Sequence, residues 1–267
     1  MKFTIGTLRV DALTLKEAID MIVSLARSGR GAAVYTPNVD HVVMAETDVD
    51  LRRAYEAATL CLADGAPLVW ASRWSPHPLP EKVSGSDLVE PLLERASREG
   101  LSVYFLGGAA GVAECAARRM SDRYPALRIC GVDAPEVGSG LSDRETRVAV
   151  SRVQAASPNL LLVGLGCPKQ ELFIHRYRRE LSPAVALGVG ATFSFLAGAV
   201  KRAPRWMSRV GLEWLYRLIQ EPRLWRRYLI RDPRFVGVVI RSLRVARALE
   251  RVHSAPGRPS SGRGSYS

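Results

Sequence analysis

The chain has 267 residues, of which 47% are hydrophobic and 24% charged, an ordinary composition for a globular protein that buries one large core or two small ones. Its four cysteines form no Cys-x-x-Cys pair, so neither a zinc site nor a disulfide framework is indicated. The net charge of +12 lies entirely in residues 201–267, with 16 basic and 4 acidic residues, because residues 1–200 carry 22 of each.

The N-terminus lacks the apolar stretch of a signal peptide, so we expect a cytoplasmic protein.

The first 200 residues alternate between short apolar runs and helical patterns. Short apolar runs predict buried parallel strands at 32–36, 59–63, 102–108, 127–132, 159–166 and 184–190. Helical patterns lie at 15–27, 86–98, 111–123, 143–156 and 169–181. This alternation predicts an α/β body over residues 1–200, with a mostly parallel, Rossmann-like sheet flanked by helices.

The segment from Leu181 to Val200 has no charged residue and is long enough to span a membrane. Pro183, Gly188 and Gly190 interrupt it. We therefore interpret it as a buried strand followed by a short helix.

The charge after Lys201 predicts a separate role for the C-terminal quarter. Residues 201–235 combine many arginines with three of the five tryptophans, and prolines 204, 222 and 233 divide the segment into separate helices. Arginine with tryptophan suits an anionic membrane surface, so we expect a basic, amphipathic helical arm over residues 201–252. The alternative is a helix packed on the core with a solvated basic face. Residues 253–267 are rich in Gly, Ser and Pro and predict a disordered tail.

Polar residues follow the predicted strands, and in open α/β sheets the ligand crevice lies outside the carboxyl ends of the strands. Thr36 and Asn38 follow the first run, and Asp64 follows the second. Asp64 is the candidate catalytic residue, since a carboxylate at a strand end can act as a general base. The alternative is that Asp64 caps a helix starting near Pro67.

Two glycine-containing turns are candidate phosphate or sugar sites. Gly107 and Gly108 would let the backbone approach a phosphate, although tight packing explains these glycines equally well. Gly166, Lys169 and Gln170 surround a proline-started helix, where hydrogen-bond donors could meet an anion or a sugar. An ordinary proline-started helix is the alternative.

The sequence predicts no metal site and no cofactor. Asp48 and Asp50 resemble a metal-binding Asp-x-Asp, but they stand at the head of a helical stretch, where capping is the expected role. The four histidines lack metal-ligand spacing. Cys167 lies near a helix start that could lower its pKa, but no histidine partner is evident, so we interpret it as an ordinary thiol.

Six motifs occur along the chain in the order TPNVD, ADG, SGSD, GLGCPKQE, GVGATFSFLAG and KRAPRWMSRVGLEWLYRLIQEP. Taken together, they resemble the WecG/TagA/CpsF glycosyltransferase family over roughly residues 3–245. The resemblance implies an inverting transfer of a sugar from a UDP-sugar, typically UDP-N-acetylmannosamine. The acceptor would be N-acetylglucosamine linked to undecaprenyl diphosphate, in cell-wall, capsule or exopolysaccharide synthesis, and no catalytic metal would take part.

The same resemblance implies roles for individual residues. Asp64 matches the proposed base, and Thr36, Asn38 and Gln170 match polar residues of the pocket. The arm residues that would meet the membrane and close over the diphosphate are Arg217, Arg223 and Arg226. The chain departs from the family pattern where Lys82 replaces a common arginine, which weakens a phosphate contact, and where Ser194 replaces a common aspartate.

Two other functions are weighed against this one. A Rossmann-type oxidoreductase is disfavoured because no Gly-x-Gly-x-x-Gly follows the first strand. A nucleic-acid-binding protein is disfavoured because the positive charge accompanies tryptophan-rich amphipathic helices. We expect a peripheral protein on the inner face of the cell membrane, with a homo-oligomer left open.

Overall fold

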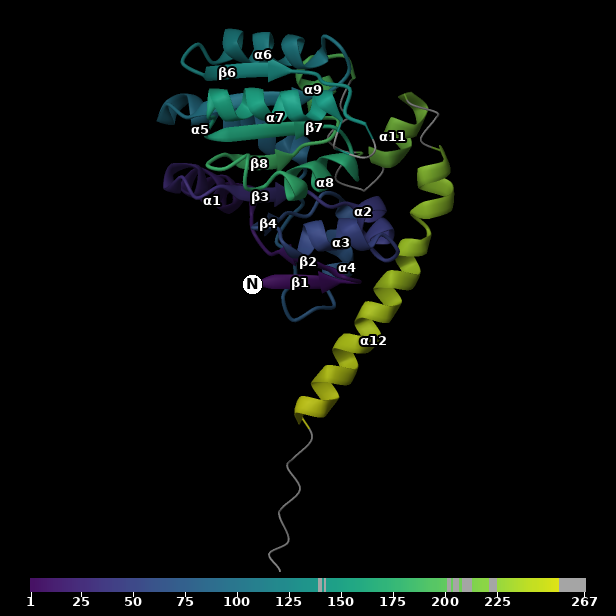
Figure 1. Ribbon diagram of the computed structural model, residues 1–267. Coiled ribbons are helices and arrows are strands. Elements are labelled where there is room, and N and C mark those ends of the chain that lie inside the picture. The colour runs from purple at the N-terminus through teal and green to yellow at the C-terminus, as the bar shows by residue number, and fades with distance from the viewer. Residues whose placement is uncertain are drawn as a thin grey trace, which may run out of the picture.

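The computed structural model describes residues 1–138, 141, 143–200, 203, 207, 213–220 and 225–254. The centre of the body is a six-stranded sheet in the order β4-β3-β8-β7-β5-β6, with every pairing parallel. The strands are β3 (Ala32–Tyr35), β4 (Leu60–Cys61), β5 (Ser102–Gly107), β6 (Arg128–Asp133), β7 (Leu160–Gly164) and β8 (Val185–Gly188). The predicted α/β class and parallel sheet are therefore confirmed (Figure 1).

Helices cover both faces of the sheet, which explains why its inner strands are continuous apolar runs. On one face, Ala32 and Val34 of β3 belong to a core cluster shared with α1, α5, α6 and α9. On the other face, Ala33 and Tyr35 pack with α3, α7 and α8. Those helices span Leu15–Ser28 (α1), Gly85–Glu99 (α5), Val112–Arg123 (α6), Thr192–Leu196 (α9), Val49–Glu56 (α3), Arg144–Ala156 (α7) and Lys169–Arg176 (α8).

The uncharged segment 181–200 folds as predicted, into strand β8 and the short helix α9. Within the described ranges, no helix is long and apolar enough to cross a membrane. Helix α8 ends at Arg176, earlier than expected, and β4 contains only two residues. The short helix α2 (Val39–Ala45), after β3, lies outside the predicted set, and α4 (Ala66–Ser72), after β4, is the helix considered near Pro67.

An N-terminal hairpin, which was not predicted from the sequence, lies beside the sheet. Its antiparallel strands are β1 (Lys2–Ile5) and β2 (Leu8–Asp11), with one buried face in the same core cluster as α2 and α3. Gly6 in its turn has φ +55°, and an added Cβ would collide with Glu46 and Val238. The backbone N–H of Gly6 donates to Oγ of Ser242 at 2.8 Å, so the hairpin turn contacts the C-terminal helix.

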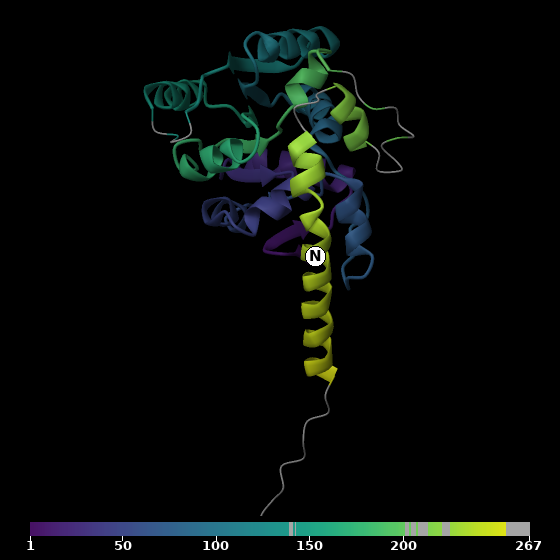
Figure 2. The ribbon, with the colours of Figure 1, turned by 90° about the vertical axis from the view of Figure 1, so that its right-hand side faces the viewer.

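The described parts of the arm are helix α11 (Glu213–Gln220), the π-helix η2 (Arg227–Arg231) and helix α12 (Arg234–Ser254). They run along one side of the body, and α12 continues past it (Figures 1 and 2). Phe235 and Val238 are buried in the core cluster that contains β1 and α2, so the first turns of α12 pack on the body. Pro233 separates η2 from α12 as predicted. The expected tail falls almost entirely in residues 255–267, which lie outside the described residues, while α12 itself continues to Ser254.

Candidate functional site

A cavity of about 420 Å³ opens at the carboxyl ends of β3, β4, β7 and β8, where the sequence predicts that the polar loops converge. Residues of the body and the arm line it together: Thr36, Asn38, Asp40, His41, Asp64, Gly85, Ser86, Gly166, Cys167, Gln170, Val189, Gly190, Ala191, Thr192, Phe195, Arg226, Arg227 and Arg231. A second cavity of about 660 Å³ shares Gly166, Gly190 and Ala191 with the first. The two cavities are therefore adjacent parts of one crevice at the strand ends, as expected for an open α/β sheet.

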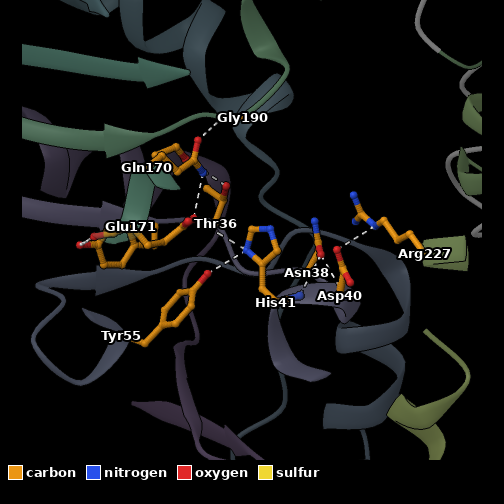
Figure 3. A network of polar contacts seen from close by, with 11 residues as sticks. Thr36, Asn38, Asp40, His41, Tyr55, Gln170, Glu171, Gly190 and Arg227 are labelled. Carbon is orange, nitrogen blue, oxygen red and sulfur yellow. Dashed lines mark hydrogen bonds and ion pairs between the residues drawn. The ribbon is translucent and has the colours of Figure 1, made fainter. Parts of the chain in front are cut away.

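The loop after β3 brings two predicted polar residues to the cavity wall. Thr36 is 7% exposed, and its Oγ1 donates to the carbonyl of Gly188 on β8 at 3.4 Å. Asn38 caps helix α2, because its Oδ1 accepts from the backbone N–H groups of Asp40 at 3.0 Å and His41 at 3.3 Å. The cap fixes the Asn38 side chain, whose amide nitrogen points away from α2 (Figure 3).

Asp64 lies in the same cavity wall as Thr36 and Asn38. Its backbone N–H donates to the carbonyl of Pro37 at 2.9 Å, which joins the loops after β3 and β4. The helix-cap alternative is wrong, because Gly65 is the N-cap residue of α4 and that helix start has no side-chain cap. Asp64 therefore lines the cavity and does not cap helix α4.

The two glycine-containing turns have different roles. Gly107 adopts φ +100°, and a Cβ there would lie 2.9 Å from the backbone of Gly164, so close packing of β5 on β7 requires glycine. Gly108, Gly166 and Lys169 line the second cavity. The Nζ of Lys169 donates to the carbonyl of Val137 at 3.0 Å, which directs this side chain across that cavity.

Gln170 lines the main cavity and also holds its wall together. Helix α8 begins after Pro168, as predicted, and the Gln170 side chain is 2% exposed. Its Oε1 accepts from the backbone N–H of Gly190 at 2.9 Å, and its Nε2 donates to Oε1 of Glu171 at 2.9 Å (Figure 3). The glutamine therefore connects α8 to the loop after β8.

A buried polar network beneath the cavity was not predicted from the sequence. Nδ1 of His41 lies 3.9 Å from Oε1 of Glu171 and 2.8 Å from the hydroxyl of Tyr55 (Figure 3). Burial raises the pKa of Glu171 to about 7, against hydrogen bonds from Gln170 and Cys167 that lower it.

His41 is kept neutral by the same surroundings. Burial, together with the positive charges of Arg227 and Arg231, lowers the pKa of His41 to about 3. At neutral pH its imidazole is therefore uncharged and acts in the network only as a hydrogen-bonding group.

Within the part of the chain that the structure describes, one group of side chains could hold a metal ion. Ligand atoms of His41, Cys167 and Glu171 lie within 4.8 Å of one another. Burial and the nearby Glu171 carboxyl raise the pKa of Cys167, so this thiol is protonated at neutral pH, in agreement with the ordinary-thiol interpretation. However, His41 lies close to Cys167 in the fold. This proximity is not evident from the sequence, where the two residues are far apart.

The Asp-x-Asp pair is part of a helix start, as predicted. Asp48 is the N-cap of α3 and accepts from the backbone N–H of Leu51 at 2.9 Å. Asp50 pairs with Arg53 in the first turn at 3.5 Å. Neither aspartate is among the residues that line the main cavity.

The arm contributes cations to the cavity, but two of them differ from those expected. Arg226 lines the cavity, with its guanidinium 5.5 Å from the ring centre of Trp225. Arg227 and Arg231 line it as well and pair with Asp40. Arg223 lies outside the described residues, and of Arg217 only the backbone, in α11, is described.

Lys82 lies just before helix α5, and its Nζ is 3.0 Å from Oδ2 of Asp87. At this end of α5 the cavity is lined by Gly85 and Ser86, not by Lys82 itself. The loop that contains Lys82, where the resembling family commonly has arginine, is therefore next to the cavity.

Comparison with known proteins identifies the family of the chain. The model of the glycosyl transferase WecG/TagA/CpsF family matches residues 3–249. A protein of Bacillus spizizenii is 32% identical over 217 residues, covering 81% of this chain and 82% of its own. A protein of Bacillus subtilis is 34% identical over 199 residues, covering 74% and 75%. Both are named N-acetylglucosaminyldiphosphoundecaprenol N-acetyl-beta-D-mannosaminyltransferase. These matches favour a transferase over an oxidoreductase or a nucleic-acid-binding protein, and the chain belongs to the WecG/TagA/CpsF family of glycosyl transferases.

Proposed function

We propose that this glycosyl transferase moves N-acetylmannosamine from UDP-N-acetylmannosamine to N-acetylglucosamine carried on undecaprenyl diphosphate. The observation that carries the proposal is that one cavity is lined by a strand-end carboxylate, Asp64, and by three arginines of the arm, residues 226, 227 and 231. A sugar transfer from a nucleotide diphosphate needs a base for the acceptor and positive charge for the leaving group. The names of the two relatives supply the sugar and the acceptor.

The reaction proposed is a single displacement with inversion at the anomeric carbon. The acceptor hydroxyl oxygen forms a bond to that carbon while its proton passes to the carboxylate of Asp64. The bond from the anomeric carbon to the diphosphate oxygen breaks, and its electron pair leaves with UDP. Thr36 and Asn38, fixed in the wall beside Asp64, are the polar groups that would orient the sugar.

Positive potential for the departing diphosphate comes from side chains. Arg226, Arg227 and Arg231 line the cavity, and arginine binds phosphate oxygens through paired N–H donors. Lys169 and Gly108 line the adjoining cavity, so the second space is available to the nucleotide or to the acceptor diphosphate. We propose no metal or cofactor for this step.

The lipid-linked acceptor calls for a membrane-facing surface, and the arm supplies one. Large apolar side chains are exposed along it, at Trp214, Leu215, Ile219, Trp225, Leu229, Ile230, Val236, Ile240 and Val245. Apolar and tryptophan side chains beside many arginines are typical of helices that lie in an anionic membrane interface. We propose that the arm, 201–252, attaches the body, 1–200, to the inner face of the cell membrane.

The experiment is a donor and acceptor panel with the full chain. The protein is incubated with UDP-N-acetylmannosamine, UDP-N-acetylglucosamine or UDP-glucose and a short-chain polyprenyl-diphosphate N-acetylglucosamine. Released UDP and the extended lipid are measured by mass spectrometry. We expect both products with UDP-N-acetylmannosamine and neither when the acceptor is omitted. Preferential transfer of another sugar would overturn the donor assignment, and absence of extended lipid with every donor would overturn the function.

A further inference from the structure

Asp40 binds two arginines of the arm. Its Oδ1 lies 3.0 Å from Nε of Arg231, and its Oδ2 lies 3.3 Å from Nε of Arg227. A terminal nitrogen of Arg231 also donates to Oδ2 at 3.2 Å. One carboxylate therefore links two guanidinium groups that lie four residues apart on η2 (Figure 3 shows its contact with Arg227).

The contact lies at the cavity and joins helix η2 of the arm to helix α2 of the body. Asp40 is in the first turn of α2, which Asn38 caps and whose Val42 is buried in the core. A second nitrogen of Arg231 contacts the sulfur of Met44, one turn further along α2, at 3.6 Å. Helix η2 therefore rests along α2, and Asp40 and both arginines line the cavity.

We propose that Asp40 is the residue that positions the arm for the transfer, by binding Arg227 and Arg231 at the cavity and thereby holding Arg226 beside the departing diphosphate. This inference rests on the proposed function, and Asp40 acts through the arginines without contacting the reacting atoms.

The burial of Asp40 explains why this contact can fix a segment. The side chain is almost completely removed from water, whereas Arg227 is 21% and Arg231 43% exposed. A buried carboxylate requires cationic partners, because its lost hydration is otherwise uncompensated. Without Asp40, the two neighbouring guanidinium groups would repel each other beside α2, with Asp232 as the other carboxyl group near them.

Charged side chains of both signs line the cavity. Arg226, Arg227 and Arg231 bring three cations to the cavity, whose lining also includes Asp40 and Asp64, and Asp232 lies near Asp40. Burial raises the pKa of Asp232 to about 6, so this group provides at most one more negative charge at neutral pH. Of the three arginines, Arg227 and Arg231 pair with Asp40, and Arg226 is the one proposed to meet the diphosphate.

A second ion pair between the arm and α2 provides a matched control. Arg241 of α12 lies 2.8 Å from Oε2 of Glu46, the residue at the end of α2. Neither residue lines the main cavity. Removing this ion pair weakens the attachment of α12 to α2 without altering the cavity.

The experiment compares Asp40→Asn, Asp40→Glu and Arg241→Gln in the full chain. Hydrogen exchange of backbone amides in residues 225–236, without substrate, reports whether η2 is held on α2. We expect at least tenfold faster exchange there in Asp40→Asn, partial restoration in Asp40→Glu, and no change in η2 for Arg241→Gln. In the transfer assay, Asp40→Asn should raise KM for the UDP-sugar at least tenfold, whereas Arg241→Gln should leave KM unchanged.

Each outcome separates the inference from the proposed function. Unchanged exchange in Asp40→Asn would overturn the anchoring role, and faster exchange with unchanged kinetics would overturn the positioning role. If circular dichroism shows that Asp40→Asn does not fold, Arg227→Gln and Arg231→Gln remove the same contacts from the exposed side and decide the question. A wild-type protein without transfer activity would refute the proposed function, while the exchange measurement would still decide whether Asp40 anchors the arm.

Discussion

The side-chain oxygen of Gln170 accepts a 2.9 Å hydrogen bond from the backbone N–H of Gly190, which joins the start of helix α8 to the loop after β8. Gly190 has φ +54°, a left-handed conformation that glycine adopts without strain. Both residues line the main cavity. The glutamine of the PKQE motif is thus a support of the cavity wall as well as a candidate contact for the substrate.

Replacing Gln170 with methionine keeps its length and removes both hydrogen bonds. We expect the free energy of unfolding to fall by about 1–3 kcal/mol, because buried polar groups lose their partner, and kcat/KM to fall with it. Urea denaturation and the transfer assay measure the two effects. The control is Gln154→Met on the exposed face of α7, which should change neither. A Gln170→Met protein as stable and active as the wild type would refute the supporting role.

Asp64→Asn tests the general base. The variant keeps the shape of the side chain but cannot accept the acceptor proton, so we expect turnover to fall by roughly 10²–10⁴-fold. Asp48→Asn is the matched control, since asparagine caps a helix as well as aspartate does, and its turnover should be normal. Near-normal turnover of Asp64→Asn, with circular dichroism showing native structure, would rule out the assignment.

Glu171→Gln tests the buried carboxyl through the pH dependence of stability. Burial raises the pKa of Glu171 from an ordinary 4.5 to about 7, so between these values the folded protein binds more protons than the unfolded chain. Stability associated with this group is therefore complete below pH 4.5 and is lost as pH rises through 7. Relative to Glu171→Gln, the wild type should lose about 3 kcal/mol of unfolding free energy between pH 4 and pH 8.

The comparison between variants is needed because His41 titrates in the opposite sense. Its pKa is lowered from 6.5 to about 3, so its contribution to stability is present above pH 6.5 and is lost as pH falls through 3. Urea denaturation of the wild type and Glu171→Gln at each pH cancels this effect. Parallel stability curves for the two proteins would show that Glu171 has an ordinary pKa.

The sheet could be predicted because its strands are buried on both faces. Runs such as 102–108 and 159–166 show no alternation of apolar and polar residues, as expected for strands covered by helices on both faces. The hairpin at residues 2–11 was missed, because its strands are short and have one exposed face each. Helix capping was predicted correctly at Asp48, where the signal is local.

The family resemblance pointed to Gln170 and Arg226, and other residues of the site could be predicted because they follow strands directly. Thr36, Asn38 and Asp64 fall in this class and line one cavity. Asp40 and His41 lie in a short helix whose sequence shows only two polar residues before an apolar run, and their partners Arg231 and Glu171 are far along the chain. No local pattern encodes such pairs, because tertiary packing alone brings them together.

Metal independence is tested by chelation. Asp48 of the Asp-x-Asp pair caps a helix, and arginines supply positive charge in the cavity, so we expect transfer to be unchanged after dialysis against EDTA. The assay is repeated with added Mg²⁺ or Mn²⁺, which should give no increase. Loss of activity with EDTA and its recovery with either ion would show that a metal provides the charge for the leaving group.

The membrane contact is tested on Leu229 and Ile230 of η2, which are 59% and 49% exposed. We expect Leu229→Ser/Ile230→Ser to remain folded and to sediment with anionic liposomes at least tenfold less, because inserting two apolar side chains contributes more than about 1.4 kcal/mol. The control is Val148→Ser on α7, which removes an exposed apolar side chain from the body. This variant should bind liposomes like the wild type. Salt should weaken binding of all three proteins, since arginines near anionic lipid contribute about 1 kcal/mol each and are screened. Equal sedimentation of the double variant and the wild type would mean that the exposed face of η2 does not enter the membrane.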